Sequence, residues 1–256
     1  MSPFKIAPSR LPWRSLGLAL LSLAFVLLLW VFLLLTALRF WCFHRDYYAQ
    51  SYVKLHTAER MGIKEEELGA ATTLLLDYLN DRRQDLQLDL RRGSRREPFF
   101  GLREQAHMVD VKRLYQQALS WQLGSGLALL PLTAVLFYTR WRRRGRPSRA
   151  HSWGLSFALG LLVLGFGAVL VYALLDFEKF WTSFHELFFD NDLWLLDPSR
   201  ERLIQMVPEP FFSGLALRIA LSFMLSFSLV LGLMSRIYRV LAAPSWREPV
   251  FRKEES

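Results

Sequence analysis

The chain has one cysteine, Cys42, among 256 residues, so it cannot form an internal disulfide bond. It also lacks the G-x-S-x-G segment that presents the nucleophile in many serine hydrolases. The segment "HELFF" begins like a zinc-protease motif, but Phe189 stands where the second histidine is needed. No internal repeat is visible. The sequence therefore contains neither of these two common hydrolase motifs.

Charge is missing from four long stretches of the chain. Residues 16–38, 119–139 and 153–175 contain no Asp, Glu, Lys or Arg, and residues 212–234 contain only Arg218. Each stretch has the roughly 20 residues that a helix needs to cross the hydrocarbon of a bilayer. The first is longer than the apolar part of a signal peptide, so we expect a retained anchor. The sequence thus predicts an all-α membrane protein with four transmembrane helices.

The distribution of acidic and basic residues predicts the orientation. Residues 1–15 and 140–152 carry basic residues and no acid, which places both in the cytoplasm by the positive-inside rule. The predicted order is a cytoplasmic N-terminus (1–15), a first span (16–38), an extracellular and mainly helical cap (39–118), a second span (119–139), a cytoplasmic arginine-rich loop (140–152), a third span (153–175), an extracellular loop containing His185 (176–211), a fourth span (212–234) and a cytoplasmic tail (235–256).

The formal net charge of +9 does not indicate a nucleic-acid partner. The basic residues gather at the ends of the predicted spans, where they meet anionic lipid headgroups. We therefore expect membrane lipid as the partner of this charge.

Local patterns predict several elements outside the spans. Apolar residues recur at helical spacing in residues 71–88, and the charged segment "RRGSRREP" is typical of an exposed turn. One helix is expected to run from shortly after Pro98 into the second span. A further helix is predicted to begin with Asp197 as its N-cap and Pro198 at its first position.

Two histidines stand close to the outer ends of predicted spans. On a helix, His107 shares a face with Glu104 and has Asp110 one turn further on. His185 lies among the aromatic residues of segment 177–188, which also suits an interface with lipid. Because both lie at the same predicted depth, we expect them to face each other. Of the remaining histidines, His44 and His56 lack a comparable acid cluster, and His151 lies on the arginine-rich, cytoplasmic side.

Three interpretations of this pair remain open at this point. The imidazoles are packed side chains of a membrane scaffold or assembly factor, or ligands in a metal-dependent membrane hydrolase, or acid and base catalysts. The ligand spacing does not resemble known metal sites, so no metal or other cofactor is predicted. Arg218 is either a snorkelling side chain or a contact for an anion or carbonyl.

Two segments carry a resemblance to a known family. They are "EQAHMVDVKRL", residues 104–114, and "FWTSFHELFFDNDLWLLDPSRERLIQMVPEPFF", residues 180–212. Together with the four-span layout, they resemble the bacterial lipoprotein intramolecular transacylase family. That resemblance implies a four-helix membrane core with an extracellular cap in the bacterial cytoplasmic membrane.

The resemblance also implies an activity. The expected enzyme is an acyltransferase that moves the sn-2 acyl chain of a diacylglyceryl-cysteine to its own α-amino group, with a diacylated lipoprotein N-terminus as its substrate. Carried over by motif, the catalytic residues are His107 in "HMVDVK" and His185 in "FHELFF". Further candidates for supporting or substrate-binding residues are Glu104, Asp110, Lys112, Asp190, Asn191, Asp192, Trp194 and Arg218.

Overall fold

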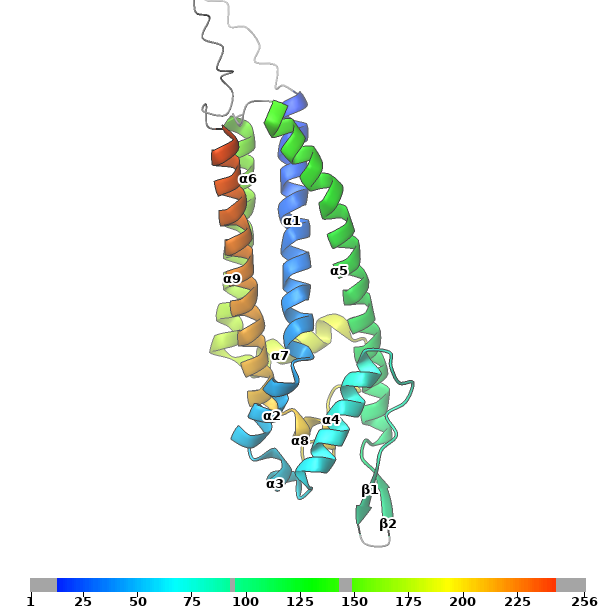
Figure 1. The fold of residues 1–256 in the computed structure, drawn as a ribbon. Coiled ribbons are helices and arrows are strands. Elements are labelled where there is room, and N and C mark those ends of the chain that lie inside the picture. The colour runs from blue at the N-terminus through cyan, green and yellow to red at the C-terminus, as the bar shows by residue number, and fades with distance from the viewer. Residues whose placement is uncertain (1–12, 93–94, 143–148, 243–256) are drawn as a thin grey trace, which may run out of the picture. The chain divides into compact units, whose positions relative to one another are not determined.

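A computed structural model describes residues 13–92, 95–142 and 149–242. Most of the predicted N-terminus, residues 93–94 of the predicted turn, residues 143–148 of the arginine-rich loop and residues 243–256 of the tail lie outside the described residues. The elements are α1 (Trp13–Cys42), α2 (Arg45–Lys54), α3 (Thr57–Met61), α4 (Glu65–Leu79), β1 (Asp89–Arg92), β2 (Arg95–Pro98), α5 (Leu102–Arg142), α6 (Arg149–Leu175), α7 (Phe177–Phe188), α8 (Arg202–Met206) and α9 (Glu209–Ala242) (Figure 1).

Several of these helices are membrane-spanning by length and composition. In the described parts of the chain, Leu16–Cys42, Leu102–Thr139 and Glu209–Ile237 are long and apolar enough to cross a bilayer, and Leu159–Leu175 in α6 is a shorter apolar stretch. The prediction of a mainly helical membrane protein is confirmed.

Helix α5 is longer than a single crossing of the membrane requires. Its 41 residues extend about 60 Å, roughly twice the thickness of the hydrocarbon. The first four turns carry charged side chains, among them Arg103, Asp110 and Arg113, whereas residues 119–139 carry none. Charge in hydrocarbon is costly, so the uncharged residues 119–139 suit a bilayer better than the charged first turns, which include His107.

The chain divides into two compact units. The first unit consists of the described residues within 1–30, 125–165 and 225–256. The second unit consists of the described residues within 31–124 and 166–224. The first unit buries Phe25, Val26 and Leu29 of α1. The second unit contains both histidines of interest.

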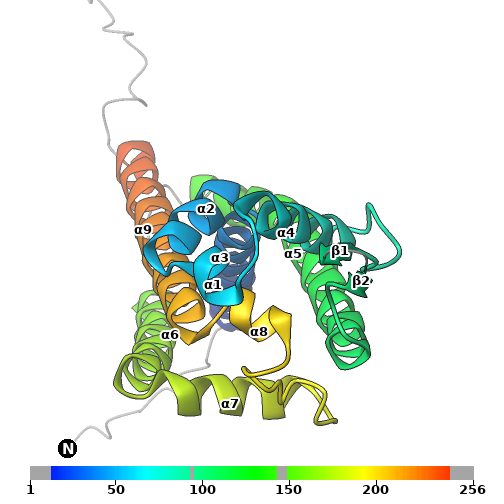
Figure 2. The same cartoon turned by 90° about the horizontal axis from the view of Figure 1, so that it is seen from below.

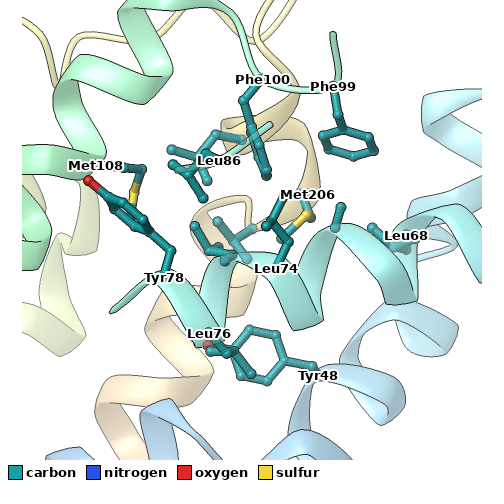
Figure 3. Packing of buried hydrophobic residues seen from close by; sticks show 14 of the residues in the cluster. Tyr48, Leu68, Leu74, Leu76, Tyr78, Leu86, Phe99, Phe100, Met108 and Met206 are labelled. Atoms are coloured by element: carbon teal, nitrogen blue, oxygen red, sulfur yellow. The ribbon is translucent and has the colours of Figure 1, made fainter. Parts of the chain in front are cut away.

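The second unit has a core of its own, built around α4 (Figure 3). Leu68, Ala71, Leu75 and Tyr78 recur at spacings of three and four residues, so they share one buried stripe of this helix. The stripe belongs to the same buried cluster as Phe99, Phe100, Met108 and Met206. Burial of such side chains stabilises the fold by about 1.5–3 kcal/mol each, and it connects α4 and α8 with the part of α5 that carries His107.

Helix α7 runs crosswise to the long helices of this unit, as Figures 1 and 2 both show. Its N-cap is Asp176, whose carboxylate accepts the backbone N–H of Lys179. The predicted helical spacing of segment 177–188 is confirmed. Elsewhere in the unit, α8 contacts α3.

The prediction for residues 71–88 is only partly right. The helix begins earlier, where Glu67 accepts the backbone N–H of Lys64, and it ends at Leu79. Asp81 follows with φ of 60°, a left-handed conformation that no helix can continue through. The chain turns at this point, so helix α4 does not extend to residue 88.

The structure also differs from the sequence prediction near the arginine-rich turn. Strands β1 and β2 pair antiparallel, with Asp89 opposite Pro98 and Arg92 opposite Arg95. The segment around the predicted turn is thus a short hairpin. Its strands were missed because strongly charged residues hide the alternation by which strands are recognised.

The predicted N-terminus of the next helix is wrong as well. Asp197 accepts the backbone N–H of Ser199, two residues on, and so forms a local turn. Helix α8 begins at Arg202, after Glu201.

Candidate functional site

A cavity of about 490 Å³ lies within the second unit. Residues of α1, α5, α6, α7 and α9 line it, together with residues of α4 and α8 and of the segments between the helices. No Asp, Glu, Lys or Arg is among the lining residues, and the only imidazoles there are those of His107 and His185. A cavity of this size and character suits an apolar ligand with few polar groups.

His107 and His185 lie side by side although 78 positions separate them. Their ring centroids are 5.9 Å apart, with 36° between the ring planes. Both side chains are buried, and the ring of Phe189 lies against each at 5.4 Å and 5.6 Å. The structure therefore brings together the two histidines that were expected to face each other.

His185 is held by its own helix. Its Nδ1 lies 2.8 Å from the backbone oxygen of Trp181, one turn earlier in α7. Because a carbonyl oxygen only accepts hydrogen bonds, Nδ1 carries the hydrogen and the neutral ring has its lone pair on Nε2. The ring also stacks on Trp194 at 4.8 Å. Burial lowers the pKa of His185, against the hydrogen bond to Trp181, which favours the charged form.

His107 has a different environment. Its buried Nδ1 has no hydrogen-bond partner among the described residues. Burial lowers the pKa of His107 to about 4; the nearby His185 acts in the same direction, and Asp110 opposes both. At neutral pH both rings are therefore uncharged, and a proton on one disfavours a proton on the other.

Glu104 shares the buried face of α5 with His107, as predicted, but its carboxylate is used elsewhere. One oxygen accepts the backbone N–H of Gly101 at 2.5 Å, and the other accepts that of Leu203 at 2.5 Å. Burial raises the pKa of Glu104, although both hydrogen bonds oppose this shift. Glu104 thus caps the first turns of α5 and α8 and has a structural role beside the histidine pair.

The segment after α7 is attached to α5 by two polar contacts. The Asn191 amide donates to the Asp110 carboxylate at 2.9 Å, and the Arg103 guanidinium donates to the backbone oxygen of Asp192. These contacts hold the segment that presents Trp194 to His185. Asp190 and Asp192 of this segment were candidates for supporting residues, but the hydrogen-bond partner of the His185 ring is the backbone oxygen of Trp181.

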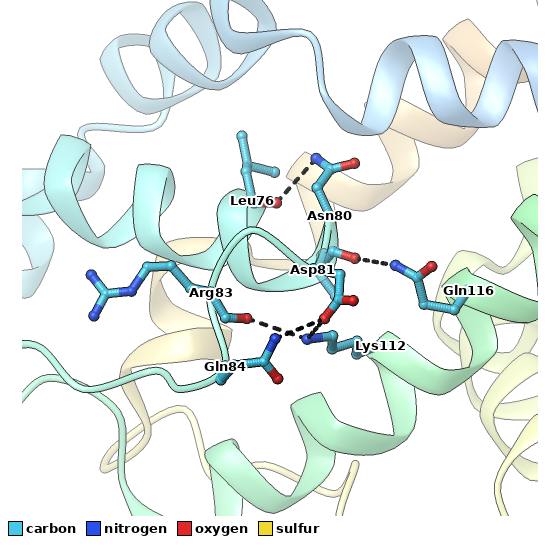
Figure 4. A network of polar contacts seen from close by, with 8 residues as sticks. Leu76, Asn80, Asp81, Arg83, Gln84, Lys112 and Gln116 are labelled. Atoms are coloured by element: carbon cyan, nitrogen blue, oxygen red, sulfur yellow. Dashed lines mark hydrogen bonds and ion pairs between the residues drawn. The ribbon is translucent and has the colours of Figure 1, made fainter.

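Other predicted residues lie outside the pair. Asp190 is exposed. Lys112 contacts Asp81 at 2.7 Å and the backbone oxygen of Arg83 at 3.3 Å, and it therefore fixes the segment that follows α4 (Figure 4). It does not line the cavity.

Arg218 is also not among the residues that line the cavity. Its guanidinium lies over the ring of Tyr47 at 4.7 Å and donates to the backbone oxygen of Gly214 at 3.1 Å. A cation over an aromatic face is stabilised by the ring's negative surface. The arrangement accounts for this single charge in the apolar part of α9.

Two contributors to the site were missed in the sequence. Phe189 contacts both imidazoles, and the backbone of Trp181 sets the tautomer of His185. The spacing of four residues between Trp181 and His185 is a helical signal that was available. The position of Phe189 beyond the end of α7 had no such signal. Among the described residues, no group of three or more His, Cys, Asp or Glu is arranged to hold a metal ion.

Fold and site together define a helical membrane protein with a buried histidine pair at an apolar cavity. The sequence pattern of the family described as lipoprotein intramolecular transacylase Lit matches residues 23–212. The chain belongs to this family, whose members are acyltransferases, and the resemblance inferred from the two histidine segments is confirmed.

Solved structures support the same fold. The in meso structure of the membrane integral lipoprotein intramolecular transacylase Lit from Bacillus cereus matches with a TM-score of 0.66 and 21% sequence identity, over 88% of this chain and 95% of that chain. A variant of that protein with one histidine replaced by alanine matches with a TM-score of 0.67 and 19% identity, over 91% and 97%. A comparison with curated proteins gave no match.

Proposed function

We propose that this protein transfers the sn-2 acyl chain of a diacylglyceryl-cysteine to the α-amino group of the same cysteine. A bond forms between the amine nitrogen and the acyl carbon, and the bond from that carbon to the sn-2 oxygen breaks. The amine loses a proton and the sn-2 oxygen gains one, so no water or cofactor is consumed. The observation that carries the proposal is the pair of imidazoles, 5.9 Å apart, on the wall of an apolar cavity.

His185 is the better base of the two. Its hydrogen bond to Trp181 leaves the Nε2 lone pair available, and its lowered pKa keeps that lone pair unprotonated at neutral pH. The α-amino group of a peptide has a pKa of about 7.7–8.0, so much of it is protonated and must give up a proton before it attacks. We assign this proton to His185.

His107 then acts at the leaving oxygen. Because protonation of either ring disfavours protonation of the other, the pair carries one proton at a time during the reaction. One proton is what the transfer has to move from nitrogen to oxygen. Each such transfer typically contributes about 10² to 10⁴ in rate.

The aromatic wall around His185 favours transfer over hydrolysis. Trp181 stacks on Phe184 at 5.4 Å and on Phe212 at 4.4 Å, and all three residues line the cavity. Such a wall limits access of water to the ester. Amine and ester belong to one molecule, so binding them in attack geometry supplies a further part of the acceleration, in favourable cases about 7–11 kcal/mol.

The proposal includes a membrane orientation. We place four spans at residues 16–38, 119–139, 153–175 and 212–234, with the cap (39–118) and the loop with His185 outside and both termini in the cytoplasm. Support comes from the apolar helices and from the distribution of positive charge. The histidine pair then meets the outer leaflet of the bacterial cytoplasmic membrane, where diacylated lipoprotein N-termini are anchored.

The test is the lipid state of a lipoprotein N-terminus, measured by mass spectrometry with and without this protein expressed. The native protein is expected to convert the diacylglyceryl form into the N-acylated lyso-form, and His107→Ala and His185→Ala are each expected to reduce conversion at least about 10²-fold. His56→Asn is the matched control, because His56 is exposed and has a left-handed backbone that asparagine tolerates.

Two results would contradict the proposal in different ways. Conversion at the native rate by either alanine variant would remove that histidine from the mechanism. No conversion by the native protein, with normal accumulation in the membrane, would refute the acyl transfer and leave a scaffold role.

A further inference from the structure

Arg218 lies on a stripe of α9 that takes no part in the cavity. Gly214, Leu221 and Leu225 share this stripe at spacings of three and four residues, and none of the four residues lines the cavity. Leu221 is 56% exposed and Leu225 is 73% exposed. Apolar side chains exposed in this way on a membrane helix are expected to face lipid. The Arg218 guanidinium therefore belongs to a different surface from the histidine pair.

The guanidinium of Arg218 has a defined position on this surface. It lies over the ring of Trp41 in α1 at 5.9 Å and over that of Tyr47 in α2 at 4.7 Å, and it donates to the Gly214 oxygen at 3.1 Å. Figure 1 shows α2 beside the first turns of α9. A Cβ at position 214 would lie 3.0 Å from the Tyr47 hydroxyl and 3.5 Å from an Arg218 nitrogen. A glycine there leaves the space that these two groups occupy.

The positive charge of Arg218 has no counter-ion in the described part of the chain. None of the carboxylates there forms an ion pair with it, and that of Asp46, in the first turn of α2, lies 4.0 Å from His44 instead. A guanidinium has several N–H donors, and the Gly214 oxygen takes one of them. The aromatic faces attract the cation but leave its other N–H groups without a strong acceptor. The arrangement is therefore complementary to an anion with two oxygens, such as a phosphate.

The depth of this guanidinium in the proposed orientation indicates the source of the anion. Arg218 lies six residues, about 9 Å, inside the outer end of the span that begins at residue 212. Its hydrogen bond to Gly214 directs the side chain back towards that end. Trp41 follows the first span by three residues, and tryptophan is enriched at the level of the lipid headgroups. The phosphodiester groups of the outer leaflet lie at this level.

We propose that Arg218, Trp41 and Tyr47 form a binding site for the phosphodiester group of an anionic phospholipid in the outer leaflet. The phosphate oxygens accept N–H groups of the guanidinium, and an acyl chain lies along Leu221 and Leu225. This lipid is a ligand and not a substrate. Because the site joins α1, α2 and α9, the bound lipid stabilises the folded protein. The proposal uses the membrane orientation given above but not the acyl transfer.

The experiment titrates the full-length protein in a neutral detergent with phosphatidylglycerol. Native mass spectrometry measures the bound lipid, and the melting temperature measures the stabilisation. Two matched ligands divide the lipid into its parts: a diacylglycerol with the same chains lacks the phosphate, and inorganic phosphate lacks the chains. We expect phosphatidylglycerol to raise the melting temperature at concentrations at which neither matched ligand has an effect.

Three variants test the residues of the site. Arg218→Gln removes the charge and is expected to weaken phosphatidylglycerol binding at least about tenfold, which corresponds to about 1.4 kcal/mol. Gly214→Ala keeps the charge but places a methyl group against the Tyr47 hydroxyl and the guanidinium, so a smaller loss is expected. Arg60→Gln is the matched control, because it removes the same charge from an exposed position on α3. We expect this control to bind the lipid with native affinity.

Each contrary outcome has its own meaning. Native affinity in Arg218→Gln, or an equal loss in Arg60→Gln, would overturn the site in favour of general attraction by net charge. Equal binding of diacylglycerol would show apolar contact only, and equal stabilisation by inorganic phosphate would show a site for free anions; either would overturn the proposal. If Arg218→Gln fails to accumulate, native affinity in Gly214→Ala would overturn it. These measurements need no acyl transfer, so this proposal and the proposed function fail separately.

Discussion

A carboxylate oxygen of Glu104 accepts the backbone N–H of Leu203 at 2.5 Å, across 99 positions of the chain. The other oxygen accepts the N–H of Gly101, so one buried side chain serves the first turns of both α5 and α8. The free backbone N–H groups of a helix start need such acceptors, and a negative charge there is favourable. The hydrogen bond to Gly101 fixes the start of α5 at Leu102, five residues before His107.

Removal of this carboxylate is therefore expected to weaken the fold more than the chemistry. Glu104→Gln keeps one acceptor oxygen but leaves a buried N–H without its partner, at a cost of about 1–3 kcal/mol. We expect a lower melting temperature in detergent and acyl-transfer activity that falls in proportion to the folded fraction. Glu186→Gln, at an exposed position, is the control. Full stability with lost activity would instead place Glu104 in the reaction.

Trp194 is expected to position His185. It stacks on that imidazole with 24° between the rings. Trp194→Phe keeps a stacking face, whereas Trp194→Ala frees the ring and is expected to lower the rate about tenfold, which corresponds to about 1.4 kcal/mol of orientation. Leu195→Ala, next to it and exposed, is the control. The measurement is the initial rate of N-acyl product formation at equal amounts of folded protein.

The contact between Asn191 and Asp110 is expected to matter through Trp194. Asn191→Ala removes the hydrogen bond to α5, worth about 0.5–1.5 kcal/mol, and so loosens the segment that holds Trp194. We expect the rate to fall about two- to tenfold. Asp190→Ala, at the exposed neighbouring position, is expected to retain native activity. Equal losses in both variants would show that the hydrogen bond between Asn191 and Asp110 is not the cause of the loss.

Acid is expected to destabilise the protein through His107. Its pKa of about 4 in the folded protein lies below the ordinary 6.5. Above pH 6.5 the imidazole of His107 is neutral in both the folded and the unfolded protein. As the pH falls from there to about 4, this imidazole becomes protonated in the unfolded chain but stays neutral in the folded protein, which lowers the free energy of unfolding. The loss is up to about 3 kcal/mol.

The comparison of melting temperatures at pH 7 and pH 5 checks this. His107→Gln is expected to lose less stability on acidification than the native protein. The pKa of Glu104 is raised, so this carboxyl acts with the opposite sign, but it is present in both proteins and cancels in the difference. An identical drop in melting temperature in the native protein and in His107→Gln would mean that His107 is readily protonated in the folded state.

Much of the architecture followed from the sequence alone. Uncharged runs such as residues 16–38 have few alternatives to a membrane helix, because only a structure with satisfied backbone groups is stable in hydrocarbon. The helical continuity from residue 102 into the second span was visible because no breaker interrupts it before Pro131. The two histidines stood out by their neighbours, and the family followed from their motifs.

Other features depended on contacts between distant segments. The end of α4 at Leu79 follows from the left-handed Asp81, which Lys112 of α5 holds by an ion pair. In the sequence, Lys112 was a candidate for substrate binding. Its ion-pair partner, Asp81 after the end of α4, could not be predicted from the spacing of the two residues in the chain. The same holds for Glu104, whose partner Leu203 lies on a helix that starts later than predicted.

The sequence by itself determined the apolar helices, the class of protein and the two imidazoles, because hydrophobic length and local motifs are properties of single segments. Only the tertiary structure decided that the rings lie 5.9 Å apart, that the Trp181 carbonyl sets the tautomer of one of them, and that a cavity of about 490 Å³ adjoins both. Distances between α5 and α7 depend on how side chains of five helices pack, and no local pattern records that packing.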